Sequence, residues 1–339
     1  MPVRSDPARI LILSNEDSTW TPRDYAEVDL ELARMHDGLI ESGYQVEVFT
    51  VLHSVKEELG RQSRYHPADW LIVNWCEQYI DRPWTDAEIA QEIEDLGYVF
   101  TGADGRALRL SLDKTLVRRC LIEAGVTVPI GQVYHDDHLD DWKIFPAIVK
   151  PSNTHASDGI TPASLVESPI ELKRQVQAVL DQYQRPVIVE EYIDGREIHL
   201  PLLGNRSIEP IAPMEIDFTL FNDIHDRFYT NEAKFDRESA RYQLVRFLCP
   251  APIDARLYAR MVEIAQTAYR AVGCRDYARI DLRLRGDQLY VLDVNHNADL
   301  TSEAEHSIAS KMMGWSYGQL ASRIIECALE RWPDRANSR

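Results

Sequence analysis

The chain has 339 residues, of which 45% are hydrophobic and 27% are charged, and its formal net charge is −18 at pH 7. This composition is that of an ordinary soluble globular protein, and the length predicts two or three domains. The acidic balance argues against nucleic acid or an anionic membrane as the main partner, although local basic residues can still bind a small anion.

The five cysteines have no CxxC spacing, and their number is odd. They are predicted to be free thiols in a reducing compartment, because neither a disulfide framework nor a zinc site fits this pattern. No apolar run reaches the length of a membrane span, and the N-terminus lacks the apolar core of a signal peptide. We therefore expect a cytoplasmic protein.

The first hundred residues alternate predicted strands with predicted helices, which indicates a parallel α/β layer. The strands are 9–14, 44–51 and 70–75, and the helices are 26–42 and 86–96. No glycine-rich phosphate loop follows the first strand, so a dinucleotide site is not expected here. Ligands of such sheets bind beyond the carboxyl ends of the strands. The residues at these ends are site candidates, or else ordinary loop and cap residues: Asn15, Glu16, Asp17, Asn74 and Glu77.

The next segment is predicted to contain a helix over 112–124, a strand over 145–151 and a strand over 187–193. The first of these strands carries Lys150. Burial of a lysine disfavours its charge unless an anion compensates it. Lys150 is therefore a candidate anion ligand; the alternative is a lysine whose ammonium group reaches solvent from the strand end. The last third adds a strand over 196–204 and helices over 255–272 and 317–332.

Residues 277–297 read YARIDLRLRGDQLYVLDVNHN, and their strict alternation predicts two strands of a hairpin. A three-residue loop, Arg285–Asp287, is expected between them. This loop would place Arg279 opposite Asp293 and make Asp281 a diagonal neighbour of Asp293, with Asn295 on the same face. A two-residue turn would put the aspartates on opposite faces. Converging oxygen ligands suit a divalent cation that also holds phosphate oxygens; the alternative is a solvated hairpin face.

Seven ordered segments together resemble the ATP-grasp superfamily, and within it the D-alanine–D-alanine ligase branch. They cover residues 98 to 330, about two-thirds of the chain: LSLDK (110–114), FPAIVKPSNTHASDGI (145–160), VIVEEYIDGREI (187–198), EAKF (232–235), CPAPI (249–253), YARIDLRL (277–284) and YVLDVNHN (290–297).

The resemblance implies an α/β and α+β protein with the ATP-grasp fold. Its parts would be an N-terminal parallel α/β domain on the substrate side (1–100), a small central α+β subdomain (101–193) and a C-terminal α+β domain with the metal site (194–332). The nucleotide would lie in the cleft between the last two. The cofactors would be ATP and two Mg²⁺ ions, with Mn²⁺ as a substitute, and the assembly a homodimer.

The resemblance also implies roles for individual residues. Lys114, Lys150 and Lys234 would contact phosphates, Glu197 would hold the ribose, and the adenine edge would meet Glu190, Glu191, Tyr192 and Ile193. Asp281, Asp293 and Asn295 would bind the metal ions. Arg279, Lys234 and Ser157 would act in catalysis, with the loop 152–159 closing over the phosphates.

The substrate contacts depart from the family pattern. The family's glycine-rich opening with a glutamate is SNEDSTWTP here, in which Glu16 or Asp17 could substitute only loosely. Phe235 stands where the family has a tyrosine, Asp299 where it has a glycine, and Ala304 where it has a serine that holds the second substrate's carboxylate. Asp299 is expected to face a substrate hydroxyl or amino group; the alternative is that it caps a short helix near Thr301.

The resemblance and these departures together imply an ATP-dependent, ADP-forming ligase that joins a small carboxylate to an amine through an acyl phosphate. Its substrates would be altered and amino-acid-like, and a specialised metabolite pathway would suit them. One alternative is a D-alanine–D-alanine ligase of cell-wall synthesis. An alternative of another class is a non-catalytic nucleotide-binding module. The complete set of lysine, arginine, aspartate and asparagine ligands speaks against that last alternative.

Overall fold

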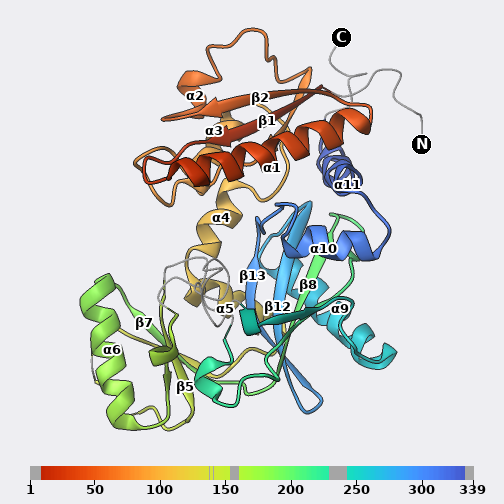
Figure 1. Cartoon of the computed structure of the whole chain (residues 1–339). Coiled ribbons are helices and arrows are strands. Elements are labelled where there is room, and N and C mark those ends of the chain that lie inside the picture. Colours follow the sequence, from red (N-terminus) through yellow and green to blue (C-terminus); the bar gives the residue numbers. More distant parts are fainter. Residues whose placement is uncertain (1–8, 137, 140, 153–159, 229–242, 333–339) are drawn as a thin grey trace.

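The computed structural model describes residues 9–332 except 137, 140, 153–159 and 229–242. Three sheets organise these residues, one in each third of the chain (Figure 1). The first sheet is parallel and the other two are antiparallel. This mixed α/β and α+β architecture confirms the predicted fold class.

The N-terminal sheet has the strand order β2-β1-β3, with β1 at Arg9–Asn15, β2 at Gln45–Val51 and β3 at Trp70–Asn74. The central strand β1 is buried from its second residue onward, as its continuous apolar run predicts. Helices α2 (Val55–Glu58) and α3 (Asp86–Asp95) share one apolar core with this sheet. Helix α1 (Pro22–Glu41) covers the other face together with α11 (Tyr317–Leu329), the last helix of the chain.

Helices α1 and α11 approach each other at a pair of glycines. A Cβ atom on Gly318 would lie 2.1 Å from the carbonyl oxygen of Gly38, so no larger residue fits without separating the helices. The first and last helices of the described chain are therefore in direct backbone contact, as Figure 1 also shows for their ends.

Substitution of Gly318 by alanine is expected to destabilise the protein by about 1–3 kcal/mol, because overpacking outweighs the better helix propensity of alanine. Thermal unfolding of the free protein measures this. Glu326→Ala, at an exposed position of the same helix, is the control and should stay within about 0.5 kcal/mol of the wild type. An unchanged melting temperature for Gly318→Ala would show that the two helices can separate freely.

The central sheet has the order β4-β7-β5-β6. Its strands are β4 (Gly131–Tyr134), β5 (Ala147–Pro151), β6 (Leu165–Val166) and β7 (Val187–Glu191). Helix α6 (Pro169–Tyr183), which the sequence analysis did not identify, buries Leu172, Val176 and Val179 against this sheet. Helices α4 (Gly105–Ser111) and α5 (Lys114–Glu123) lead into it from the N-terminal layer.

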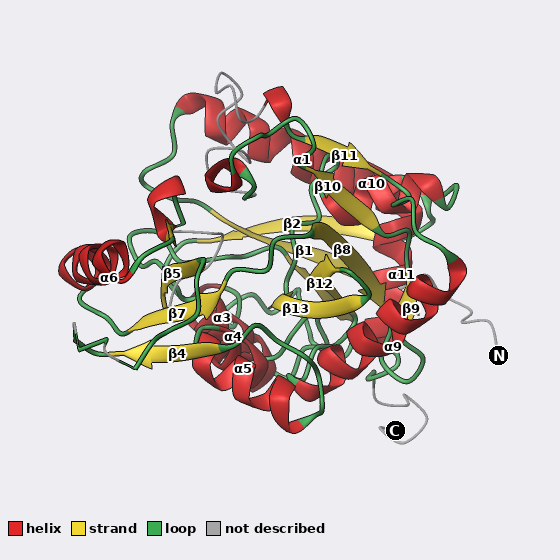
Figure 2. Ribbon diagram, turned by 90° about the horizontal axis from the view of Figure 1, so that it is seen from below, coloured by secondary structure: helices red, strands yellow, loops and turns green. Residues whose placement is uncertain are grey.

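The C-terminal sheet has the order β11-β10-β8-β12-β13, with β9 paired to β8. Its strands are β8 (Arg196–Leu203), β9 (Glu209–Pro210), β10 (Met214–Asp217), β11 (Arg246–Leu248), β12 (Tyr277–Arg285) and β13 (Gln288–Asn295). Helix α9 (Ala255–Ala271) and α5 pack on one face of β8, β12 and β13. Helix α10 (Glu305–Met312) lies near β8. Figure 2 shows the central sheet beside the C-terminal sheet, with α6 on its outer side.

The hairpin of β12 and β13 corrects the predicted register. Arg285 pairs with Gln288, so the turn has two residues, Gly286 and Asp287, and not three. Gly286 has a φ of 59°, the conformation that a type II′ turn requires at this position. A bulge then shifts the register between Asp281 and Leu282, because Leu292 is an extra residue in β13.

The bulge brings the aspartates to one face despite the short turn. Asp281 lies directly opposite Asp293, not diagonal to it, and Arg279 lies opposite Asn295, not opposite Asp293. The buried residues of β13 are Leu289, Val291 and Val294, so the buried positions change from odd to even residue numbers after the extra residue Leu292. The predicted grouping of polar side chains is therefore present, but it arises from a different local geometry.

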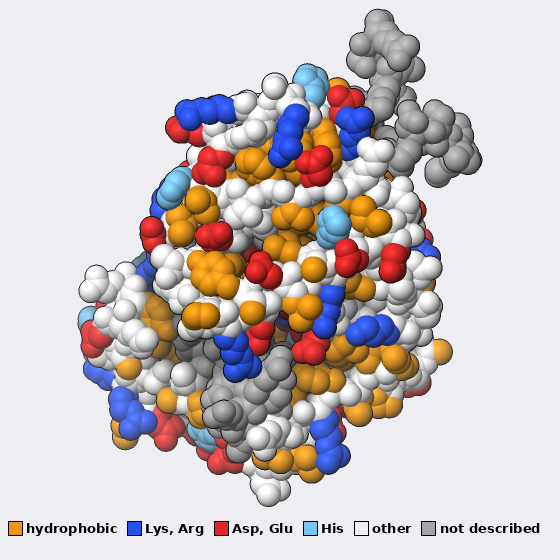
Figure 3. Space-filling view, turned by 45° about the horizontal axis from the view of Figure 1, so that its top comes forward, with side chains coloured by type: hydrophobic (Ala, Val, Ile, Leu, Met, Phe, Trp, Pro, Cys, Tyr) orange, Lys and Arg blue, Asp and Glu red, His pale blue; other side chains and the backbone are white. Residues whose placement is uncertain are grey.

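Two further features bear on partners. No helix within the described part of the chain combines the length and apolarity needed to cross a membrane. On the face in Figure 3, described lysine and arginine side chains are interspersed with aspartates and glutamates and do not form one basic patch.

Candidate active site

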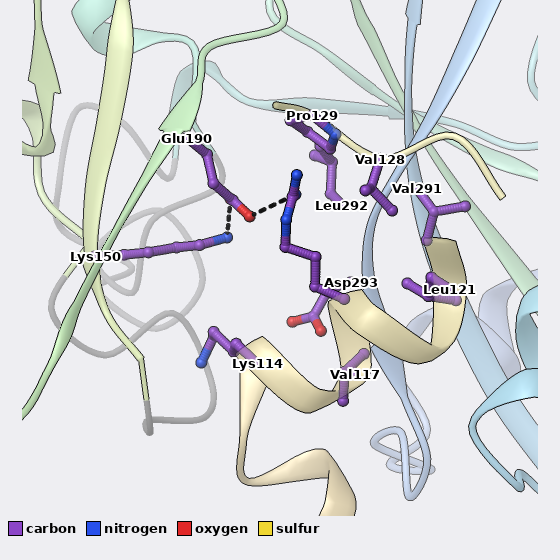
Figure 4. A pocket seen from close by; sticks show the side chains of 11 residues that line it. Lys114, Val117, Leu121, Val128, Pro129, Lys150, Glu190, Val291, Leu292 and Asp293 are labelled. Carbon is purple, nitrogen blue, oxygen red and sulfur yellow. Dashed lines mark hydrogen bonds and ion pairs between the residues drawn. The ribbon is translucent and has the colours of Figure 1, made fainter. Parts of the chain in front are cut away.

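A pocket lies between the central and C-terminal sheets, and side chains of α5, β5, β7 and β13 line it (Figure 4). Lys150 of β5 and Glu190 of β7 point toward each other across it, with 2.5 Å between Lys150 Nζ and Glu190 Oε2. Arg118 Nη1 of α5 lies 3.4 Å from Glu190 Oε1. The charge of Lys150 is therefore balanced by a carboxylate of the protein, and its position on a buried strand does not by itself require a phosphate.

The remaining pocket wall is mixed in character. Val117, Leu121, Val128 and Val291 form an apolar side, whereas Lys114 and Asp293 add charges at the other side. Lys114 is the first residue of α5, and Asp113 caps that helix by accepting from the backbone N–H groups of Thr115 and Leu116. An apolar wall beside a few charged groups is the usual form of a small-molecule site.

The structure brings Lys114, Lys150, Glu190 and Asp293 to this pocket, but not the rest of the expected adenine edge. Glu191 donates its backbone N–H to the Ile130 carbonyl at 2.7 Å, and Tyr192 donates to the Pro146 carbonyl at 3.0 Å. The Ile193 carbonyl accepts from Arg283. These backbone groups are thus engaged with the protein itself.

The polar face of the hairpin holds a compact charge cluster. Arg279 donates from Nε and Nη2 to the two carboxylate oxygens of Asp281, at 2.7 and 2.9 Å. Asn295 Nδ2 donates to Asp281 Oδ2 at 2.9 Å, which leaves its own amide oxygen directed elsewhere. Asp293, directly opposite Asp281, is exposed and accepts from the Val294 N–H.

This donor set fits a hard divalent cation. Two carboxylates and an amide oxygen on one face are the oxygen ligands that Mg²⁺ takes, usually completed by water and substrate phosphates. Among the described residues no group of three or more His, Cys, Asp or Glu side chains is arranged to hold a metal ion.

A buried network on β8 connects to this cluster. Arg283 donates to Glu197 Oε2 at 2.7 Å from Nη2, and the two residues are direct cross-strand partners. His199 Nε2 lies 3.3 Å from Glu197 Oε1 and 3.7 Å from Asp281 Oδ1, and its Nδ1 lies 3.3 Å from Glu305 Oε1. Glu305 Oε2 is 3.0 Å from Arg279 Nη1. His199 thus contacts carboxylates from three different elements.

The charges of this network fix the protonation of its members. Burial alone would raise the pKa of Glu197, but Arg283 and His199 lower it to about 2. Burial alone would lower the pKa of His199, but Asp281 and the hydrogen bonds with Glu197 and Glu305 raise it to about 9. Near neutral pH Glu197 is therefore ionised and His199 is a cation.

Residues at the carboxyl ends of the N-terminal strands lie close together. Asn15 Oδ1 accepts from the Glu77 N–H at 3.1 Å, and Gln78 hydrogen-bonds Asp17. Glu16 is half-buried, and its carbonyl accepts from Asn15 Nδ2. The amide nitrogen of the buried Asn74 has no hydrogen-bond partner among the described residues.

Asp299 accepts from Thr301 with both carboxylate oxygens, at 2.7 Å from the backbone N–H and 3.0 Å from the hydroxyl. Asp299 thus has the hydrogen bonds of a cap, which was the alternative to a substrate contact. It does not cap a helix that starts near Thr301, however, because α10 begins at Glu305. Ala304 is buried and occupies the N-cap of α10. Three predicted residues, Ser157, Lys234 and Phe235, lie outside the described residues.

The sequence analysis missed Arg118, His199, Arg283 and Glu305 as site residues. Arg283 shares the polar face of β12 with Arg279 and Asp281, and His199 follows Glu197 by two residues on β8. Because residues two apart in a strand lie on the same face, the alternation of the sequence could have predicted both as neighbours of the site. Nothing in the local sequence connects Glu305 to Arg279, because the two are joined only by the packing of α10.

Comparison with known proteins identifies a family model and relatives that this chain resembles. The family model "D-ala D-ala ligase C-terminus" matches residues 132–326. An uncharacterised protein, y4sG of Sinorhizobium fredii, is 34% identical over 243 residues, which are 71% of this chain and 69% of the relative. A D-alanine–D-alanine ligase of Cupriavidus taiwanensis is 27% identical over 72% of both chains.

Solved structures agree on the fold. A D-alanine–D-alanine ligase from Bacillus anthracis complexed with ATP superposes with a TM-score of 0.70, covering 95% of this chain and 98% of that one at 17% identity. The VanG D-Ala:D-Ser ligase from Enterococcus faecalis gives a TM-score of 0.67 at 18% identity over 95% of this chain and 99% of that one. Together with the extent of the matching family model, these findings show that the chain belongs to the D-alanine–D-alanine ligase family of the ATP-grasp superfamily, whose members are ATP-dependent, ADP-forming ligases.

Proposed function

We propose that this protein joins a small carboxylate to an amine at the expense of ATP, and that its substrates are not two molecules of D-alanine. The observation that carries the proposal is the position of the Arg279–Asp281 cluster and Asp293 on one hairpin face, next to a pocket that presents Lys114 and Lys150. Family membership supports the reaction type, and the altered substrate contacts support the change of substrates.

The chemistry needs charge neutralisation more than covalent catalysis. A carboxylate is a poor acyl donor because its leaving group would be oxide. Transfer of the γ-phosphoryl group of ATP to a carboxylate oxygen forms an acyl phosphate and releases ADP. The amine then attacks the carbonyl carbon, phosphate leaves with its bonding electrons, and the amine loses a proton. Positioning and electrostatic stabilisation are the main contributions of a protein to such a sequence.

The proposed roles follow the geometry of the site. Lys114 and Lys150 hold phosphate oxygens, and Arg279 stabilises the charge that develops on the transferring and acyl phosphate groups. Asp281, Asp293 and Asn295 hold divalent cations, whose contribution when bound is to neutralise phosphate charge. Glu197 is directed to the ribose from a position that Arg283 and His199 fix. Glu190 changes partner from Lys150 when a nucleotide enters.

The proposed substrate change depends on the residues that replace the family's contacts. Ala304 has no hydroxyl group, and the Asp299 carboxylate is occupied by Thr301. A second candidate function, D-alanine–D-alanine ligation with altered contacts, is favoured by the names of several relatives.

Incubation with ATP, Mg²⁺ and a panel of carboxylic and amino acids, with ADP formation and product mass as readouts, tests the proposal. Hydroxylamine added in place of the amine traps an acyl phosphate as a hydroxamate and so identifies the acid. Saturable formation of D-alanyl-D-alanine from D-alanine alone would establish the second candidate. If the protein bound the nucleotide but formed no ADP with any acid of the panel, it would be a non-catalytic nucleotide-binding module.

Lys150→Ala is expected to weaken ATP binding by about 10- to 100-fold, because a charge-assisted contact to phosphate is lost and Glu190 gains no replacement partner. Calorimetric titration of ATP measures the affinity. Lys143→Ala, which removes an exposed lysine that precedes the same strand, is the control and should bind ATP like the wild type. Equal ATP affinities for the two variants would remove Lys150 from the nucleotide site.

A further inference from the structure

The carboxylate of Glu190 is shared by two cations of the pocket. Lys150 Nζ lies 2.5 Å from its Oε2, and Arg118 Nη1 lies 3.4 Å from its Oε1. All three side chains are at most 16% exposed, and Figure 4 marks both contacts of Glu190 with dashed lines. Because each cation contacts a different oxygen, Glu190 can release Lys150 and keep Arg118 without turning its side chain.

The two cations come from different parts of the fold. Lys150 lies on β5 of the central sheet, next to β7, which carries Glu190. Arg118 lies on α5, whose residues Val117 and Leu121 belong to the apolar core of the C-terminal sheet. The contact between Arg118 and Glu190 therefore crosses the pocket from one sheet to the other, whereas the contact of Lys150 stays within the central sheet.

A glycine provides the space for the contact between Arg118 and Glu190. Gly131 of β4 is the direct cross-strand partner of Glu190. A Cβ atom at Gly131 would lie 2.8 Å from Glu190 Cγ and 3.2 Å from Arg118 Cζ, so a larger residue would press against both side chains. The φ of Gly131 is not positive, so the backbone conformation does not require glycine here. Room for this ion pair is what the glycine supplies.

A triphosphate in this pocket would take Lys150 away from Glu190, because the proposed function assigns Lys150 to phosphate oxygens. Two carboxylates are among the described residues that line the pocket, Glu190 and Asp293. Asp293 is assigned to the divalent cations, which would compensate its charge, but Glu190 has no such assignment. A carboxylate without a counter-charge would repel the phosphates and hold Lys150 back.

We propose that Arg118 is a positioning residue for nucleotide binding, which compensates the charge of Glu190 when Lys150 turns to the phosphates. Arg118 acts through Glu190 and does not itself contact the nucleotide. The inference rests on the proposed function, because it assumes that Lys150 binds phosphate. Arg118 thus lets Lys150 change partner while the Glu190 carboxylate stays in place at the pocket wall.

Arg118→Met removes the charge and keeps an apolar side chain that can pack like the arginine stem. We expect the ATP affinity to fall by about 10-fold, because Glu190 then keeps Lys150 as its counter-charge. Arg118→Lys retains the charge and should recover most of the lost affinity. Arg119→Met is the matched control, since Arg119 is the next residue of α5 and its side chain is 65% exposed. It should bind ATP within about twofold of the wild type. Calorimetric titration of ATP measures each affinity.

Glu190→Gln gives the readout that separates this role from a structural one. In its presence no charge needs compensation, so the double variant Arg118→Met/Glu190→Gln should bind ATP at least about threefold more tightly than Arg118→Met alone. Within the Glu190→Gln background, the loss of Arg118 should change the affinity by less than about twofold. A general disturbance of the pocket would not be reversed by a second substitution, and a direct contact of Arg118 with phosphate would be lost in both backgrounds.

Three results would overturn the inference: equal ATP affinities of Arg118→Met and Arg119→Met, a double variant that binds as weakly as Arg118→Met, or a loss of affinity when Arg118 is removed from Glu190→Gln. The comparison within the Glu190→Gln background stands even if Arg118→Met alone folds poorly, and melting temperatures show which variants are folded. Failure of Lys150→Ala to weaken ATP binding would instead refute the phosphate role of Lys150, and that variant keeps Arg118.

Discussion

Asp281→Asn is expected to lower turnover by at least about 100-fold while the protein remains folded. The loss of a metal-binding carboxylate leaves phosphate charge uncompensated and so raises the activation free energy by several kcal/mol. Asp281 is the centre of the hairpin cluster, where Arg279 and Asn295 both donate to it. Asp293→Asn, directly across the hairpin, should have a similar effect. ADP formation at saturating Mg²⁺ measures turnover.

Asp287→Asn is the matched control, since it makes the same chemical change at the exposed turn of the same hairpin. It should leave turnover within about twofold of the wild type. The melting temperature of Asp281→Asn separates loss of a ligand from loss of fold. Near-wild-type ADP formation in both aspartate variants of the cluster would show that the metal assignment is wrong.

Glu197→Gln is expected to lower the free energy of unfolding by about 3–5 kcal/mol, because it leaves the guanidinium group of Arg283 buried without its counter-charge. Arg283 is 3% exposed and donates twice to Glu197, so water cannot replace the lost partner. Chemical denaturation of the ligand-free protein measures the change. The same variant should bind ATP weakly if Glu197 also holds the ribose.

Glu57→Gln provides the contrast, because Glu57 pairs at 3.4 Å with Arg61, which follows the end of α2, and both side chains are largely exposed. Its loss should change the free energy of unfolding by less than about 1 kcal/mol. The effect of Glu197 should also depend on pH in one direction. Its pKa is lowered from 4.5 to about 2 in the folded state, so its stabilisation is present above pH 4.5 and is lost as the pH falls toward 2. A constant difference between wild type and Glu197→Gln across that range would contradict the assignment.

The hairpin shows how far sequence patterns can define a site. Alternation of polar and apolar residues predicted both strands and placed Asp281, Asp293 and Asn295 together. The route to this result was wrong at the turn, because the pattern does not distinguish a two-residue turn with a bulge from a three-residue loop. Both geometries bring Asp281, Asp293 and Asn295 to one face. They differ in the cross-strand partners of Asp281 and Arg279, and in the face taken by the residues of β13 before the bulge.

Other differences have separate physical causes. Helix α6 carries a readable start signal, because Ser168 caps it, Pro169 follows, and Glu171 donates its N–H to the cap. The partner of Lys150 could not be predicted in the same way, since Glu190 lies on another strand and only the pairing of β5 with β7 brings the two charges together.

The position of α11 has a consequence for how this protein is made. The apolar face formed by Ile10, Ile12, Leu71 and Val73 is closed by Ala321, Ile325 and Ala328 of the last helix. A ribosome releases the N-terminal strands long before it has synthesised that helix, so the part of this face that α1 does not cover stays exposed throughout translation. Such a surface invites association with other chains. We therefore expect a nascent chain stalled before residue 317 to be held by chaperones and to be sensitive to proteases, and the first hundred residues alone to be poorly soluble.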